Sequence, residues 1–322
     1  MICRYDFAPL DGITRVVFRR VWHKHFGGAD RYFMPFFSPT EHHTITPRDF
    51  RDIDPVSNAG MPAIPQIMSC KAPDFLWGTE RMRDLGYPEV NLNLGCPSGT
   101  VTAKGKGAGF LARPEELERF FDEVFSHTVL PVSVKTRLGI ADPEEFPRLM
   151  EIYNQYPISC LTIHARVQKE KYKGEVHLDT FAQAVKDSKI PLCYNGDLRT
   201  VEEVRAFEAQ FPSVDAVMIG RGAVADPALL RKLRGGEAAT KEELQAFLQE
   251  LYREYQAFYG GQIATAAQRM REVWFYLIHM FDDADKLNKK LRRFRSPGEY
   301  ETIEAAIFQE LNLRENCQGE LT

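Results

Sequence analysis

Short apolar runs alternate with longer amphipathic stretches from the N-terminus to about residue 233. A short apolar run is typical of a buried strand, and apolar positions spaced three and four residues apart are typical of a helix with one packed face. Eight strand–helix cycles can be counted in this part of the chain. The predicted strands end near Pro9, Pro35, Ile67, Asn93, Thr136, His164, Asn195 and Gly220.

Helical spacing between the predicted strands is clearest over residues 14–26, 115–125, 146–156 and 201–211. Eight strand–helix repeats in this length predict a closed parallel (β/α)8 barrel, the TIM barrel. An open doubly wound sheet is the alternative, and it would carry a dinucleotide fingerprint after its first strand. The sequence Ala-Pro-Leu-Asp-Gly at residues 8–12 is no such fingerprint, so the barrel is favoured.

The alternation stops after residues 235–236, a Gly-Gly pair. Long helical patterns follow over residues 241–259, 264–281, 285–295 and 299–311. We therefore predict an α/β protein with two domains. Residues 1–235 would form the TIM barrel, and residues 236–322 a smaller all-helical C-terminal domain.

A length of 322 residues with 44% hydrophobic content is enough for a barrel and a smaller appendage. No apolar stretch approaches the roughly 20 residues that cross a bilayer, and Arg4, Asp6 and Asp11 interrupt the N-terminus before a signal-like core. We expect a cytoplasmic protein with no membrane partner. The six cysteines lie far apart without a Cys-x-x-Cys pair, which indicates neither a disulfide framework nor a structural metal.

The formal net charge of −4 gives no global sign of nucleic-acid binding, so an RNA partner would have to be held by a local basic patch. One candidate patch lies in the helical tail, and its plainer interpretation is a solvated helix face. It comprises Lys286, Lys289, Lys290, Arg292, Arg293 and Arg295. The oligomeric state is not determined by the sequence, and we expect a monomer.

Cys96 lies in the run Asn-Leu-Asn-Leu-Gly-Cys-Pro-Ser at residues 91–98, where an apolar strand ends in a Gly-Cys-Pro turn. This places a thiol at a strand end, where barrel enzymes carry their catalytic groups. Most free cysteines are simply buried small hydrophobes. The cationic glycine-rich segment 104–109 that follows favours a working acid or nucleophile instead.

Further polar residues collect at the other predicted strand ends. Lys135 ends an apolar strand and would be costly to bury without an anionic or electron-rich partner, so we expect it to face a ligand. Residues 195–197 (Asn-Gly-Asp) and 220–222 (Gly-Arg-Gly) follow the last two strands, where barrels of this type bind phosphate through backbone N–H groups. Gln66, Asn93, His164 and Arg166 complete the set.

These motifs, taken together, resemble those of the tRNA-dihydrouridine synthase family, in the family's order and across the whole barrel. The matching stretches are residues 8–14, 18–19, 66, 91–98, 104–108, 134–137, 164–166, 195–197 and 218–222. The helical tail is similar to the family's tRNA-binding domain in length and position. Two departures are Leu10 in place of methionine, and Ala165 and Val167 in place of the Gly and Thr of a His-Gly-Arg-Thr motif.

The resemblance implies an FMN enzyme that reduces the C5–C6 double bond of specific uridines in tRNA, with NADPH as reductant. It implies that Cys96 is the proton donor. The implied FMN contacts are Pro9, Leu10, Asp11, Gln66, Lys135, His164, Asn195, Gly196, Asp197, Gly220 and Arg221. The expected substrate contacts are Asn93, Arg166 and Lys104, with Lys289, Lys290, Arg292 and Arg293 of the tail.

Two alternatives remain at this point. An FMN barrel acting on a free small molecule, such as dihydroorotate or an activated alkene, would not need the helical tail. A non-catalytic RNA-binding protein on a barrel scaffold would not need Cys96, Lys135 and Arg221 together.

Overall fold

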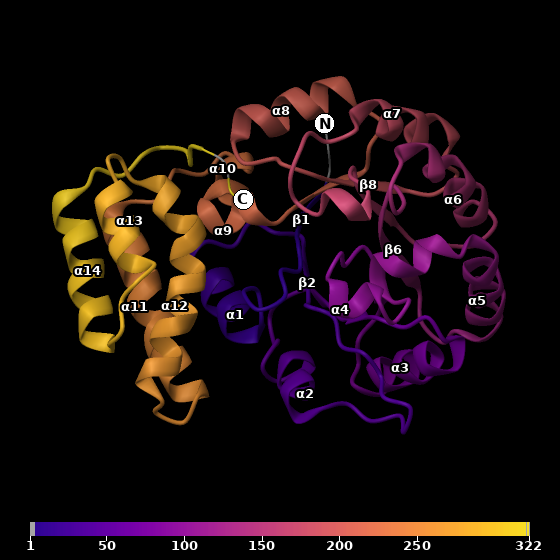
Figure 1. Cartoon of the computed structure of the whole chain (residues 1–322), viewed down its shortest axis with the longest axis horizontal. Coiled ribbons are helices and arrows are strands. Elements are labelled where there is room, and N and C mark those ends of the chain that lie inside the picture. The colour runs from indigo at the N-terminus through magenta and orange to yellow at the C-terminus, as the bar shows by residue number, and fades with distance from the viewer. Residues whose placement is uncertain (1–3, 320, 322) are drawn as a thin grey trace.

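The computed structural model describes residues 4–319 and 321, and its parallel strands surround a common axis with helices outside them (Figure 1). The sheet order is β3-β2-β1-β9-β8-β7-β6-β5-β4. Each predicted strand end lies within two residues of an observed one, and the predicted barrel is confirmed. The strands are β1 (Arg4–Phe7), β2 (Arg31–Phe33), β3 (Ala63–Ile64), β4 (Gln66–Ile67), β5 (Val90–Leu94), β6 (Val132–Arg137), β7 (Leu161–His164), β8 (Leu192–Asn195) and β9 (Ala216–Ile219).

The third strand position of the barrel is divided by Pro65 into β3 and β4. Proline has no N–H to donate to a ladder, so regular pairing stops there. The first half pairs with β2, where Ile64 lies opposite Phe33, and the second half pairs with β5, where Gln66 lies opposite Asn91. The barrel therefore has eight strand positions but nine strands.

Helices cover the outside of the barrel, and those predicted from the sequence are present with ends within three residues of the predicted ones. The longer ones are α1 (Val16–His25), α2 (Pro47–Ile53), α3 (Ala72–Asp84), α5 (Pro114–His127), α6 (Phe146–Tyr153), α7 (Leu178–Asp187) and α8 (Val201–Gln210). Short helices are α4 (Gly99–Thr102), α9 (Arg221–Ala225) and α10 (Leu229–Leu233).

The C-terminal region is helical, as predicted, and stands beside the barrel next to α1, α9 and α10 (Figure 1). Its helices are α11 (Lys241–Phe258), α12 (Ile263–Leu277), α13 (Asp285–Leu291) and α14 (Pro297–Glu310). Helix α13 ends earlier than the predicted residue 295, because the chain turns there to bury Phe294. The hydroxyls of Thr240 and Ser296 cap α11 and α14 by accepting hydrogen bonds from backbone N–H groups three residues on, at 3.2 Å.

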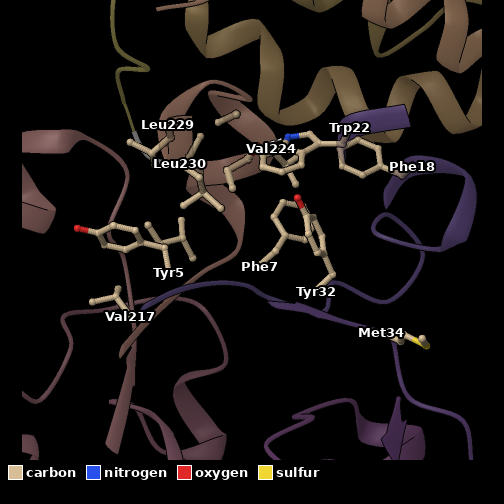
Figure 2. Close-up of a cluster of buried hydrophobic side chains, with 14 of the residues drawn as sticks. Tyr5, Phe7, Phe18, Trp22, Tyr32, Met34, Val217, Val224, Leu229 and Leu230 are labelled. Atoms are coloured by element: carbon tan, nitrogen blue, oxygen red, sulfur yellow. Dashed lines mark hydrogen bonds between the residues drawn. The ribbon is translucent and has the colours of Figure 1, made fainter. Parts of the chain in front are cut away.

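Helix α1 joins the barrel to the helical region through one continuous hydrophobic core. On the barrel side, the Trp22 ring lies 4.6 Å from that of Phe7 in β1, and Figure 2 shows Trp22 level with Val224 of α9 and Phe7 below it. On the other side, the rings of Phe18 and Phe26 lie 6.0 and 5.2 Å from Phe247 of α11. The two regions therefore bury apolar surface against each other instead of meeting through a flexible linker.

No helix within the described residues combines the length and apolarity needed to span a membrane. The described part of the chain also contains no group of three or more histidine, cysteine or carboxylate side chains that could hold a metal ion. All five cysteines in that part are free thiols.

Candidate active site

A cavity of about 650 Å³ opens at the C-terminal ends of the barrel strands. Its volume lies in the range of small-molecule and cofactor sites. The structure brings nearly all of the predicted strand-end residues together in its wall. They are Pro9, Leu10, Asp11, Gln66, Asn93, Cys96, Lys135, His164, Arg166, Asn195, Gly196, Asp197, Gly220 and Arg221.

The other predicted site residues lie away from the cavity. Lys104 is exposed in the segment after Cys96, and its side chain is not part of the cavity wall. The tail cations are also exposed, on α13 and the turn that follows it, and none of them lines the cavity. They are Lys286, Lys289, Lys290, Arg292, Arg293 and Arg295. Their assignment to substrate binding stays a prediction.

Cys96 is held at the cavity by the turn that ends β5. The side-chain oxygen of Asn93 accepts hydrogen bonds from the backbone N–H groups of Gly95 and Cys96, at 3.0 and 2.9 Å. This closes the turn and fixes the position of the half-buried thiol. Burial raises the pKa of the Cys96 thiol, so the group is protonated at neutral pH.

The segment after Cys96 contains two short helical pieces. It forms α4 and a 3₁₀ turn over Gly107–Ala112. Gly107 has φ +56°, and a Cβ at this position would lie 2.9 Å from the Cys96 carbonyl oxygen. The glycine therefore allows the segment to pack against the thiol-bearing turn.

Buried amides connect β4, β5 and β6 below the thiol. Asn93 donates to Gln66 at 2.6 Å, Gln66 donates to Asn91 at 2.7 Å, and Asn91 donates to the Ser133 hydroxyl at 2.9 Å. All four residues are buried. These hydrogen bonds fix the orientation of the Gln66 amide in the cavity wall. Sequence reasoning did not select Asn91, although its two-residue spacing from Asn93 places both on one face of β5.

Lys135 reaches the cavity from β6 and donates a hydrogen bond to the side-chain oxygen of Asn195 at 2.8 Å. Asn195 in turn donates to the Met218 carbonyl at 2.8 Å, which sets the orientation of its amide. Burial, and then the charge of Arg137, lower the pKa of Lys135 to about 7. A buried ammonium whose partner is a neutral amide would be stabilised by an anionic ligand in the cavity.

Asp197, two residues after Asn195, lies between two arginines that also line the cavity. Arg166 donates to its carboxylate at 3.1 Å, and Arg221 forms a second ion pair with it. Burial opposes ionisation of Asp197, but the hydrogen bond and charge of Arg166 hold its pKa below the ordinary value. The buried Nε atom of Arg166 has no hydrogen-bond partner among the described residues.

His164 stands beside these arginines and is neutral. Burial, reinforced by the positive charges of Arg137 and Lys135, lowers its pKa well below the ordinary value. The ring therefore offers one donor and one acceptor nitrogen at neutral pH instead of a charge.

Tyr172 lies in the loop after β7 and lines the cavity, although sequence reasoning did not select it. Its ring lies 5.3 Å from the guanidinium of Arg137 and 5.5 Å from that of Arg221. The residue is 43% exposed, so these two arginines do not enclose it. The loop has no periodic pattern that would reveal this position.

The residues present fit a flat, anionic cofactor such as FMN. Lys135 offers positive charge, and the amides of Gln66 and Asn195 offer fixed hydrogen-bonding edges. A Cβ at Gly222 would lie 2.4 Å from the Leu198 carbonyl oxygen, so the loops after β8 and β9 approach through bare backbone. Such glycine-lined loops suit a phosphate group.

Comparison with known proteins agrees with this geometry. The family model described as Dihydrouridine synthase (Dus) matches residues 6–312. The chain belongs to the dihydrouridine synthase family. Family membership confirms the resemblance seen in the sequence. As a member of this family, the protein is an enzyme and an oxidoreductase.

Curated relatives of this dihydrouridine synthase family member match along most of their length. It is 27% identical over 281 residues to tRNA-dihydrouridine synthase B of Pasteurella multocida, covering 84% of this chain and 83% of that protein. It is also 27% identical to the probable tRNA-dihydrouridine synthase 2 of Bacillus subtilis, covering 93% of this chain and 92% of that protein. A third relative, the tRNA-dihydrouridine(16) synthase of Ralstonia nicotianae, is 27% identical, with 92% and 93% covered.

Solved structures support the barrel assignment at the level of the fold. Morphinone reductase superposes with a TM-score of 0.51 at 14% identity, covering 74% of this chain and 87% of that one. Its complex with tetrahydroNAD gives a TM-score of 0.50 at 14% identity, with 74% and 88% covered.

The lowered pKa of Lys135 predicts how stability depends on pH. Between about pH 7 and the ordinary lysine value, the unfolded chain binds a proton that the folded, unliganded protein does not. Stability should therefore rise with pH in this window, by about 1.4 kcal/mol per pH unit at most. Lys135→Met should remove this rise and stabilise the unliganded protein at pH 7. Urea unfolding at pH 6, 8 and 10 measures both effects.

The exposed Lys286 provides the matched control for that experiment. Lys286→Met should leave the pH dependence of the free energy of unfolding as in the wild type. A Lys135→Met protein with the same pH dependence as the wild type would show that the Lys135 ammonium is not desolvated in the cavity.

Proposed function

We propose that the protein reduces specific uridines in tRNA to 5,6-dihydrouridine with FMN as cofactor and NADPH as reductant. Family membership and the names of the relatives support this activity. The observation that carries the proposal is one cavity wall holding both a neutral thiol, Cys96, and a buried ammonium, Lys135.

The reaction adds two hydrogens across a double bond conjugated to a carbonyl. Reduced FMN, when bound, supplies the hydride that reaches C6 of the uracil. The developing negative charge lies on C5 and the C4 oxygen, and Cys96 donates its thiol proton to C5. Because burial keeps the thiol protonated, it suits general-acid catalysis better than nucleophilic attack.

Lys135 would hold the pyrimidine edge of the flavin and stabilise negative charge on it. The backbone of residues 195–197 and 220–222 would hold the phosphate, because the guanidinium of Arg221 is already paired with Asp197. Neutral His164 would hydrogen bond to a ring edge without adding charge. The partly exposed Tyr172 would form part of the wall beside the uracil.

A uridine stacked within folded RNA cannot reach the bottom of this cavity, so the base must be turned out of its stack at a cost of a few kcal/mol. Contacts elsewhere on the tRNA must supply that energy. We assign them to the exposed cations of α13 and its following turn, in the proposed tRNA-binding domain of residues 236–322. Residues 1–235 would carry the catalytic chemistry.

Two measurements test the proposed function. The purified protein should be yellow and contain about one FMN per chain, because a single cavity collects the proposed cofactor residues. Mapping of dihydrouridine in tRNA from cells with and without the protein should show the loss of the modification at defined positions. A colourless protein that cannot be reconstituted with FMN, or an unchanged tRNA, would refute the proposal.

A further inference from the structure

The chain after α14 leaves the helical region and returns to the barrel (Figure 1). We use the name strap for residues 311–319 together with Leu321. Leu321 is only 4% exposed, and it lies in the cavity wall beside residues of the barrel. A segment remote from the barrel strands in sequence is therefore part of the candidate active site.

The first half of the strap is tied to α10 and to the end of α12. Lys232 donates hydrogen bonds to the Glu315 carbonyl and to the side-chain oxygen of Asn316, both at 2.7 Å. The backbone N–H of Gln318 donates to the carbonyl of His279 at 3.2 Å, and the His279 ring contacts the Gln318 carbonyl at 3.0 Å. These contacts fix the direction in which the strap approaches the cavity.

The second half of the strap is bound by the two loops to which we assign the phosphate. Arg199, in the loop after β8, donates to the Gly319 carbonyl at 2.9 Å. Arg221, the first residue of α9, donates to the Leu321 carbonyl at 2.9 Å and also pairs with Asp197. The guanidinium of Arg221 is thus held on one side by the barrel and on the other by the strap.

We propose that the strap retains the bound flavin by closing the phosphate side of the cavity, with Arg221 as the positioning residue that connects the strap to the phosphate loops. This inference rests on the proposed function, since it concerns the FMN of that same site. The flavin leaves on this side only after the Leu321 and Gly319 contacts break. Release of the flavin is therefore limited by detachment of the strap.

Two variants loosen the strap without changing the barrel residues. Gly319 has φ +86°, a conformation that a β-branched side chain rarely adopts, so Gly319→Val strains the strap backbone. Leu321→Asp places a carboxylate where the side chain is now buried. Gly261→Val is the matched control, because Gly261 has φ +83° with open space around it, in the turn between α11 and α12.

The experiment measures the rate at which FMN leaves each loaded protein after dilution, followed by the fluorescence of free FMN. Both strap variants should release FMN about tenfold faster than the wild type, the change expected for loss of one charge-assisted hydrogen bond. Gly261→Val should release it at the wild-type rate. Circular dichroism and thermal unfolding of the unliganded proteins show whether the variants keep their fold.

Release from a folded Leu321→Asp protein at the wild-type rate would overturn the strap inference, even if Gly319→Val failed to fold. Faster release from Gly261→Val as well would also overturn it, because general loosening of the helical region would then be the cause. A wild-type protein that binds no FMN would instead refute the proposed function, and the role of the strap with it.

Discussion

Replacing Cys96 with alanine should leave flavin binding and flavin reduction by NADPH intact, while the reduction of tRNA falls by about 10²–10⁴-fold. The thiol lies in the cavity wall but is not required by any cofactor contact that we propose, so only the proton to C5 is lost. Stopped-flow spectroscopy separates the two half-reactions. The first half-reaction follows flavin bleaching by NADPH, and the second follows its reoxidation by tRNA.

Cys70 supplies the matched control for this experiment. It is a free, half-buried thiol whose sulfur lies 3.9 Å from the Lys104 carbonyl, close to the segment that follows Cys96 but outside the cavity wall. In the Cys70→Ala protein, tRNA should reoxidise the reduced flavin at the wild-type rate. If the same held for Cys96→Ala, another group would have to donate the proton.

The predictable part of this site is the part set by strand periodicity. In a parallel barrel all strands end at one rim, so a polar residue that follows an apolar run is placed at the rim by the alternation alone. Lys135, His164 and Asn195 were found in this way, and each lies in the cavity wall. The same reasoning needs no knowledge of long-range contacts.

The contributions of the loops and the tail could not be predicted in the same way. Tyr172 and Leu321 reach the cavity from segments without periodicity. Arg137 and Arg221 contact the Tyr172 ring, and Arg221 also binds the Leu321 carbonyl, from other parts of the chain. No local pattern in a sequence encodes such pairs.

Sequence patterns also do not predict how the barrel and the helical region pack against each other. The Gly-Gly pair at residues 235–236 predicts a boundary, but the aromatic rings of Phe18, Phe26 and Phe247 form a shared core across it. Removing residues 236–322 would therefore expose apolar surface of α1 as well as removing the strap. Charge substitutions on the intact chain test the role of the helical region more cleanly.

Reversing the charge of four tail cations should weaken tRNA binding by about 10²-fold or more and reduce the slope of log K against log salt by up to about 3. Each cation that neutralises a phosphate releases counterions, so its loss lowers both the affinity and its salt dependence. All four side chains are exposed, and their reversal buries no charge. The substitutions are Lys289→Glu, Lys290→Glu, Arg292→Glu and Arg293→Glu.

A second quadruple variant separates a specific tRNA surface from a general effect of net charge. It reverses four exposed cations on the barrel helices α3, α5 and α7 and in the turn after α7, and so changes the net charge by the same amount. Its substitutions are Arg81→Glu, Arg119→Glu, Lys186→Glu and Lys189→Glu. Binding is measured by fluorescence anisotropy at several salt concentrations. We expect the large loss and the reduced slope for the tail variant alone, since we propose that the tail cations meet the tRNA phosphates. Equal losses of tRNA affinity in both variants would mean that the tail cations act only through net charge. Unchanged tRNA binding by the folded tail variant would mean that the tRNA binds elsewhere on the molecule.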